Sequence, residues 1–209
     1  MTPLAWVLLG LAAVFAVGNW IAVAREAQGA IYVCKPAALA FLIAVALALD
    51  PTHADARAWF VVALAFSLLG DVLLMLPRDA FVFGLGAFLL GHVFYMVGLN
   101  LHSDGLWLLA IPVALVALVL GVRLVRGLRR GGHESLVPPV VAYVVVISAM
   151  ASSALASGNA LAAIGAALFM ASDAMIGEQR FVRPRAWVPV AIMATYHLGQ
   201  AGLVLSLVR

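Results

Sequence analysis

Apolar residues run through this chain in long, nearly uninterrupted stretches, and charged or turn-forming residues gather in short clusters between them. A helix that crosses the hydrocarbon core of a bilayer needs about 20 consecutive, predominantly apolar residues. Eight stretches of about this length follow one another along the chain. The pattern therefore predicts eight membrane-spanning helices, over residues 3–24, 31–49, 57–76, 80–101, 104–122, 137–156, 159–177 and 186–208.

Composition agrees with this pattern. Hydrophobic residues make up 66% and charged residues 10% of the 209-residue chain, whereas soluble domains have roughly 45–50% and 25%. The longest connection, residues 123–136, is too short and too polar for a separate domain. We expect one all-α domain over residues 1–209, a polytopic membrane bundle in which the helices themselves build any active site.

The positive charges are distributed unevenly between the two ends of the predicted helices. Only Arg57 and Arg209 fall at the end that carries the termini. The other ten of the twelve Lys and Arg residues fall at the opposite end: Arg25, Lys35, Arg78, Arg123, Arg126, Arg129, Arg130, Arg180, Arg183 and Arg185. The positive-inside rule places this second end in the cytoplasm and both termini outside it.

The net charge of +3 then reflects topology and anionic lipid, and we expect no nucleic-acid partner. Eleven Arg and one Lys in a background of Ala, Val and Leu are typical of a GC-rich bacterial genome. These features predict a bacterial inner-membrane protein. Its oligomeric state leaves no signature in the sequence.

Two carboxylates interrupt otherwise apolar helices, Asp71 in "SLLGDVLLML" and Asp173 in "LFMASDAMIG". A charged residue near the centre of a membrane helix costs on the order of 2.5–3.5 kcal/mol on insertion scales, and it usually marks a functional site inside the bundle. At 1.5 Å per residue, both lie roughly 7 Å from the midplane on the cytoplasmic side. Four further polar residues lie at this level or near the midplane: Lys35, Asn19, His92 and His197.

Two carboxylates and one ammonium group in a medium of low dielectric constant supply acid–base chemistry, because one carboxyl can donate a proton while the other activates water. The two Asp and two His residues could alternatively hold a metal ion through N and O ligands. None of the four shares a predicted helix with another, and no local spacing such as HExxH occurs. We therefore expect no metal and no cofactor.

Other intramembrane polar residues have a simpler explanation. A lone Tyr, Ser or Asn in a membrane helix often forms an interhelical hydrogen bond of modest strength, about 0.6 kcal/mol on average. From the residues alone, we expect this structural role for Tyr95, Tyr143, Ser67 and Asn19.

The pattern also suggests an internal duplication. "SLLGDVLLML" followed by "GHVFY" resembles "FMASDAMIG" followed by "YHLGQ", with Asp-to-His spacings of 21 and 24 residues. Lys35-Pro36 opens the second predicted helix much as Pro138-Pro139 opens the sixth. Two halves of four helices in the same orientation would place the third and seventh helices at equivalent positions around a central cavity.

Five short motifs resemble the lysoplasmalogenase, or YhhN-like, family of integral membrane proteins. They are Lys35-Pro36, Gly70-Asp71, "FVFGLGAFLLGHVFY" at 81–95, "GAALFMASD" at 165–173 and "TYHLGQ" at 195–200. The resemblance implies cleavage of the vinyl ether bond of lysoplasmalogens to a fatty aldehyde and a glycerophospho-alcohol. Carried over residue by residue, it points to Lys35, Asp71, His92, Tyr95, Ser172, Asp173, Tyr196 and Gln200. His197 departs from the pattern, because the family commonly has a second aromatic residue there.

The implied reaction suits the two carboxylates. Protonation of the distal vinyl carbon gives an oxocarbenium ion, which water captures, and Asp71 and Asp173 can share the acid and anion roles as paired carboxylates do in glycosidases. Lys35 and the cytoplasmic arginines would attract the phosphate of a lysophospholipid drawn from the membrane. The alternatives are a small-molecule or lipid transporter that uses the same Asp and Lys residues as a relay, and a purely structural membrane protein.

Overall fold

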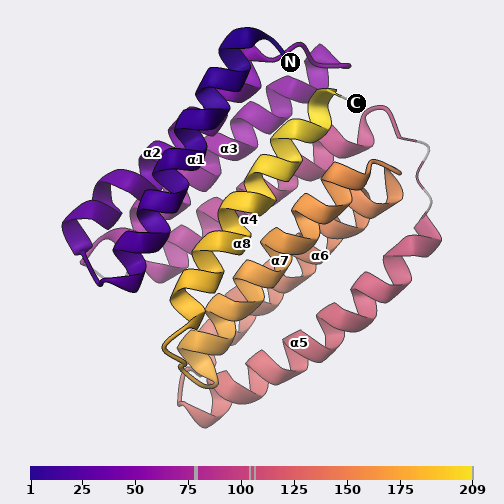
Figure 1. Cartoon of the computed structure of the whole chain (residues 1–209). Coiled ribbons are helices and arrows are strands. Elements are labelled where there is room, and N and C mark those ends of the chain that lie inside the picture. The colour runs from indigo at the N-terminus through magenta and orange to yellow at the C-terminus, as the bar shows by residue number, and fades with distance from the viewer. Residues whose placement is uncertain (78–79, 104, 106, 209) are drawn as a thin grey trace.

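The computed structural model describes residues 1–77, 80–103, 105 and 107–208. Over these ranges the chain forms an all-α bundle whose eight long helices are each long and apolar enough to cross a membrane (Figure 1). The helices are α1 (Pro3–Ala24), α2 (Gln28–Ala48), α3 (Ala54–Met75), α4 (Phe81–Asn100), α5 (Ala110–Arg130), α6 (Val137–Ala156), α7 (Ala160–Phe181) and α8 (Val188–Leu205). The prediction of an all-α bundle with eight spanning helices is confirmed, and the chain is an integral membrane protein.

Several predicted helix boundaries are wrong by three or more residues, and two of them change the interpretation. The segment from Arg123 to Arg130, expected as a connection, forms the last two turns of α5. The helix outlasts the apolar stretch because Leu124 and Leu128, spaced four residues apart, bury one face while the arginines project from the others. The second helix begins at Gln28, so Pro36 lies inside α2 and does not open it.

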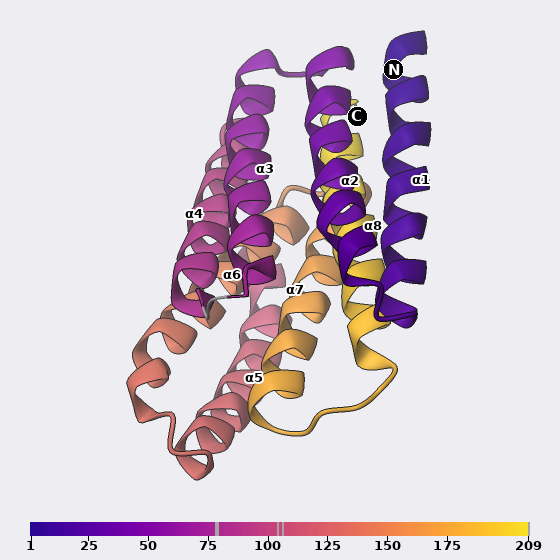
Figure 2. The same ribbon diagram turned by 90° about the vertical axis from the view of Figure 1, so that its left-hand side faces the viewer.

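Helix pairs adjacent in sequence form the closest contacts, α1 with α2, α3 with α4, and α7 with α8. Additional contacts of α4 with α6 and of α8 with both α1 and α2 close the bundle. Both termini lie at one end, as Figures 1 and 2 show from two directions. Arg25, the end of α5 and the connection between α7 and α8 lie at the other end. Two positions used in the charge argument, Arg78 and Arg209, fall outside the described residues.

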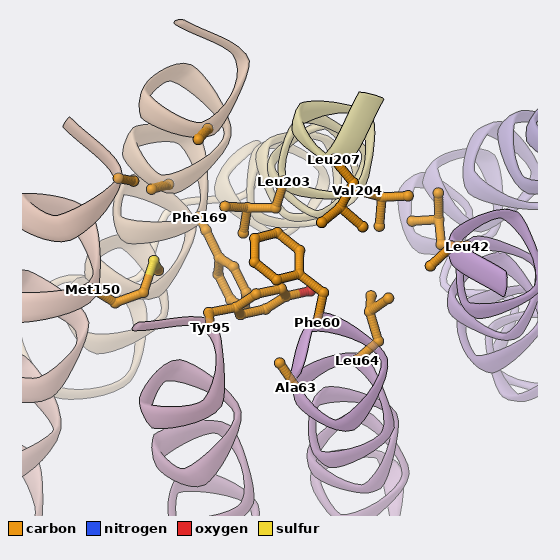
Figure 3. Close-up of a cluster of buried hydrophobic side chains, with 14 of the residues drawn as sticks. Leu42, Phe60, Ala63, Leu64, Tyr95, Met150, Phe169, Leu203, Val204 and Leu207 are labelled. Carbon is orange, nitrogen blue, oxygen red and sulfur yellow. The ribbon is translucent and has the colours of Figure 1, made fainter. Parts of the chain in front are cut away.

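The core lies where α3, α4, α7 and α8 meet. The ring of Phe60 on α3 packs edge-on against Tyr95 on α4, with 5.0 Å between centroids. Phe169 of α7 and Leu203 of α8 complete this cluster, and all four side chains are at most 2% exposed (Figure 3). The cluster fixes the helices that carry the intramembrane carboxylates.

The contact between α7 and α8 is backbone against backbone. A Cβ atom on Gly165 would lie 2.7 Å from the amide nitrogen of Leu203 and 2.8 Å from the carbonyl oxygen of Gly199. Small residues drive such close approaches in membranes, where the hydrophobic effect does not hold helices together. In contrast, α5 lies at the edge of the bundle, with two buried residues, Leu124 and Leu128, along its length (Figure 1).

Candidate functional site

Asp71 on α3 is held by charged and polar groups from two other helices. Lys35 on α2 places its Nζ atom 3.0 Å from Asp71 Oδ1. The Tyr196 hydroxyl on α8 donates a hydrogen bond of 2.7 Å to Asp71 Oδ2. Asp71 is 1% exposed, so these two groups compensate a carboxylate that has almost no contact with solvent or lipid.

This network continues through α8 to α4. The Tyr95 hydroxyl donates to Gln200 Oε1 at 2.5 Å, and Gln200 Nε2 lies 3.4 Å from the Tyr196 hydroxyl. The chain of contacts therefore joins α2, α3, α4 and α8 through five of the residues that the sequence singled out. Buried polar networks whose members are satisfied make the surrounding structure rigid.

Asp173 on α7 has its own pair of partners. The Tyr143 hydroxyl on α6 donates a short hydrogen bond to Asp173 Oδ2. The Nε2 atom of His92 on α4 lies 2.9 Å from the same hydroxyl and 3.4 Å from Asp173 Oδ2. Which of these contacts His92 donates depends on its tautomer. Three helices thus bring a carboxyl, a phenol and an imidazole together.

The two aspartates have corresponding surroundings. Each contacts a residue from the helix before its own, Lys35 for Asp71 and Tyr143 for Asp173. Each also contacts a helix of the other half, since Asp71 meets Tyr196 of α8 and Asp173 meets His92 of α4. The correspondence therefore pairs His92 with Tyr196, and not with His197 as the motif spacing suggested.

One aromatic side chain separates the two groups. The Phe169 ring lies 4.7 Å from the His92 ring and 5.3 Å from the Tyr196 ring, measured between centroids. An apolar side chain therefore lies between the two networks.

A cavity of about 60 Å³ lies among α3, α4, α5, α6 and α7, and Asp173 is part of its wall. Tyr143 lies beside it, and the remaining lining is almost entirely apolar, including Phe88, Leu124 and Phe181. Neither Asp71 nor Lys35 lines this cavity. Of the two carboxylates, Asp173 is therefore the one that a molecule in the cavity would meet.

A wider hollow of about 840 Å³ lies against the last turns of α5 and the end of α7. Arg123, Arg126 and Arg130 line it, and Phe181 belongs to both this hollow and the apolar cavity. Glu178 holds the guanidinium of Arg123 through two hydrogen bonds. Among the residues that the structure describes, no carboxylate forms an ion pair with Arg126 or Arg130.

Comparison with known proteins places this chain in a family. The model of the YhhN family matches residues 30–207. The chain belongs to the YhhN family. All eight side chains that the sequence resemblance pointed to lie within the matched range.

Named relatives cover much of this YhhN-family chain. Proteins called lysoplasmalogenase are 37% identical in Mycobacterium bovis, over 77% of this chain and 64% of the relative, and 34% identical in Homo sapiens (TMEM86B), over 70% and 62%. An uncharacterized membrane protein YhhN of Escherichia coli is 35% identical over half of each chain. The match thus spans less than two thirds of the length of the lysoplasmalogenases. No solved structure matches the chain.

One residue of this site was not expected from the sequence of the YhhN-family chain, and one expected residue lies outside it. Tyr143, expected to be structural, contacts both Asp173 and His92. Its position one helix before Asp173, as Lys35 is one helix before Asp71, was the available signal. Ser172 is buried, but it donates to the Ile192 carbonyl at 3.0 Å and so joins α7 to α8 outside both networks.

The alternative metal set does not converge in this YhhN-family structure. His92 contacts Asp173, whereas His197 Nδ1 accepts a hydrogen bond of 3.0 Å from the Trp20 indole. Within the described ranges, some buried side-chain polar atoms have no hydrogen-bond partner: both amide atoms of Asn19, Nδ1 of His92 and Nε2 of His197. The free Nδ1 of His92 leaves that ring able to accept or pass on a proton.

Proposed function

We propose that this chain hydrolyses the vinyl ether bond of lysoplasmalogen-type lysophospholipids, releasing a fatty aldehyde and a glycerophospho-alcohol. Membership of the YhhN family and the relatives named lysoplasmalogenase support this activity. The observation that carries it is the position of Asp173, a carboxyl group in the wall of an apolar cavity inside a membrane bundle. An acid in such a place can meet a substrate that arrives from the bilayer.

The reaction consumes one water molecule. It needs a proton donor and a nearby anion. A proton adds to the vinyl carbon distal to the ether oxygen, which leaves an oxocarbenium ion on the adjacent carbon. Water adds to that carbon and loses a proton, and the resulting hemiacetal collapses to aldehyde and alcohol. Asp173 serves as the proton donor, and its carboxylate then faces the cation, as carboxylates do in glycosidases.

The neighbours of Asp173 have complementary roles. The Tyr143 hydroxyl orients the carboxyl group through its Oδ2 atom, which leaves Oδ1 to face the substrate. His92 lies within reach of both groups and takes up the proton that the captured water loses, so that Asp173 is recharged. Asp71 and Lys35 form their ion pair behind Phe169, where the carboxylate of Asp71 favours the cationic intermediate.

The shape of the cavity determines which part of the substrate enters it. A volume of about 60 Å³ corresponds to roughly two water molecules in the liquid, far less than a fatty chain occupies. The vinyl ether enters beside Asp173, and the hydrocarbon tail lies along α5, which yields because few of its side chains are buried. The phosphate lies in the hollow with Arg126 and Arg130, since guanidinium groups bind phosphate through two parallel hydrogen bonds.

The uneven distribution of Lys and Arg supports one orientation in the membrane. The arginine-rich end faces the cytoplasm of a bacterial inner membrane, and both termini face away from it. The substrate then comes from the cytoplasmic leaflet, on the side of the midplane where Asp173 and the end of α5 lie.

Turnover by the purified protein tests the proposal. The chain in detergent should release a fatty aldehyde from a lysoplasmalogen and none from the saturated ether analogue, which has no vinyl carbon to protonate. Detergent solution has no second compartment, so release of aldehyde distinguishes a hydrolase from a transporter. Intact lysoplasmalogen after incubation with correctly folded protein would rule the hydrolase out.

A further inference from the structure

Three potential metal ligands meet at the end of the bundle that carries the termini. His53 directly precedes α3, Asp55 lies in the first turn of α3, and His102 follows the end of α4. Asp55 is sixteen residues before Asp71 on the same helix, which is about 24 Å along the axis. This cluster is therefore separate from the carboxylate networks inside the bundle.

The three side chains already lie in contact. His102 Nε2 is 2.9 Å from Asp55 Oδ2 and 3.0 Å from Oδ1. The His53 ring stacks on the His102 ring with 3.9 Å between centroids and 15° between planes. One ligand atom from each of the three residues lies within 4.8 Å of the other two.

These distances are close to those of a metal site. Zinc binds imidazole nitrogen at about 2.0–2.1 Å and carboxylate oxygen at about 2.0–2.2 Å, which puts tetrahedral ligand atoms roughly 3.4 Å apart. Side-chain rotations must close the difference, and the His53 ring must turn out of its stack on His102, because the nitrogen lone pairs of two parallel rings do not point at one ion. The side chains of His102 and Asp55 are 40% and 57% exposed, so they are free to make these rotations.

A simple ion pair explains only part of this arrangement. Asp55 in the first turn of α3 suits the positive end of the helix dipole, and His102 can pair with it. That ion pair does not explain why the His53 ring stacks on His102, because two imidazoles side by side repel each other when both are protonated. A shared cation that binds neutral imidazoles uses both rings and the carboxylate together.

The neighbouring surface leaves room for a fourth ligand. A hollow of about 180 Å³ adjoins the cluster, and the two imidazoles form part of its wall. Its other polar side chains are Thr52, Ser103, Ser157, Asn159 and Ser206. Water in this hollow can complete a tetrahedral shell around an ion held by three protein ligands.

We propose that His53, Asp55 and His102 form a binding site for a divalent cation of the zinc class. Two nitrogen ligands and one oxygen ligand favour Zn²⁺, Co²⁺ or Ni²⁺ over Mg²⁺ and Ca²⁺, which prefer oxygen alone. A bound ion would tie the start of α3 to the end of α4. The site is independent of the proposed hydrolase activity, and its test uses no lipid substrate.

Titration of the purified full-length chain with Zn²⁺ tests the site. After treatment with EDTA and dialysis, equilibrium dialysis should show one ion bound per chain, unaffected by excess Mg²⁺. Replacement of a ligand, in His53→Gln, Asp55→Asn or His102→Gln, should weaken binding by roughly 100-fold or more, beyond the 10–100-fold that loss of an outer-shell partner costs. Co²⁺ bound at the site should give visible absorption bands typical of tetrahedral coordination.

The variants are chosen so that folding does not obscure the result. His102 lies beyond the last residue of α4, and the side chain of His53 forms no capping hydrogen bond with α3. His133→Gln changes another exposed histidine and should bind zinc like the unmodified chain. Binding that persists in both His53→Gln and His102→Gln, or that disappears in His92→Gln, would overturn the proposal.

Discussion

Lys35 and Asp71 form an ion pair of 3.0 Å between α2 and α3, with side-chain exposures of 9% and 2%. The other carboxylate oxygen of Asp71, Oδ2, accepts a hydrogen bond from the Tyr196 hydroxyl. Burying two charges in a bilayer is costly, and their attraction offsets that cost only if both are present and further hydrogen bonds satisfy them. Variants of this pair can therefore separate its effect on stability from its effect on activity.

Removing one member of this pair should destabilise the protein strongly. Lys35→Met leaves a carboxylate without its cation, and breaking a buried pair in this way costs about 3–5 kcal/mol. Thermal unfolding in detergent should show a lower midpoint. In the double variant Lys35→Met/Asp71→Asn both charges are absent, and the midpoint should return close to that of the unmodified chain while hydrolysis stays lost. A Lys35→Met variant as stable as the parent would contradict the importance of the pair.

Loss of either carboxylate should abolish most turnover. Asp173→Asn cannot donate a proton to the vinyl carbon, and Asp71→Asn removes the negative charge behind the site. Each should lower kcat by at least about 100-fold, which is typical both for loss of a general acid and for loss of a preorganised electrostatic group. Asp50→Asn, which changes an exposed carboxylate after α2, should retain full activity. Near-normal turnover in Asp173→Asn would show that the acid has been assigned to the wrong residue.

Isotopes report which bonds form during hydrolysis. In D₂O one deuterium should appear on the carbon next to the aldehyde, because the carboxyl of Asp173 exchanges with solvent between turnovers. With ¹⁸O-labelled water the label should enter the aldehyde, and the glycerol oxygen should keep its original isotope. The aldehyde must be reduced to the alcohol as it forms and compared with an enzyme-free control, since aldehydes exchange both labels. Label in the glycerol product would place cleavage on the other side of the ether oxygen.

The arginine-lined hollow should govern affinity and leave the chemical step intact. Arg126→Gln together with Arg130→Gln removes charge-assisted hydrogen bonds to the phosphate, each worth about 1.5–3 kcal/mol. KM should rise by about 10-fold or more, while kcat changes little. Arg129→Gln is the matched control, because Arg129 lies on the same turns of α5 but outside this hollow. An equal rise in KM for all three positions would indicate general membrane electrostatics.

Cysteine labelling can establish the direction of insertion. In a Cys34→Ala background, a membrane-impermeant maleimide added to intact cells should label Asp50→Cys between α2 and α3. It should reach Glu134→Cys, between α5 and α6, only after the membrane is permeabilised. These two positions are exposed and lie at opposite ends of the bundle. The reverse pattern would place the arginine-rich end outside the cytoplasm.

The role of the two carboxylates in the site is predictable from the sequence, because an Asp in an apolar membrane helix is so unfavourable that it usually marks a function. Lys35 follows by the same argument, and depth counted along each helix places it beside Asp71. Burial of Tyr143 is not unfavourable in this way, since a phenol is tolerated in a membrane helix. Only its place one helix before Asp173 was a signal, and the direction of its side chain is set by packing against α4 and α7. His197 misled the comparison of halves because adjacent residues on a helix point about 100° apart, so Tyr196 turns toward Asp71 while His197 turns toward Trp20.

Helix number is predictable from hydropathy, but the end of α5 is not. Hydropathy falls at Arg123, yet the backbone stays helical because Arg and Leu are good helix formers and Leu124 and Leu128 still pack against the bundle. The start of α2 shows the same effect, since Gln28 and Gly29 add a turn before the apolar stretch. Boundaries depend on contacts at the membrane surface, which periodicity within the apolar stretches does not record.

The helices around the cavity beside Asp173 differ in how tightly they are packed. Gly165 and Gly199 bring α7 and α8 into backbone contact, whereas Leu124 and Leu128 are the buried residues of α5. Lipid tails are as apolar as leucine, so lipid can replace the sparse contacts of α5 at little cost. Substrates with longer or more unsaturated tails would therefore displace α5 to different extents while they meet an acid in the same position. Different helices would then determine which tail lengths are accepted and how accurately the proton donor is placed.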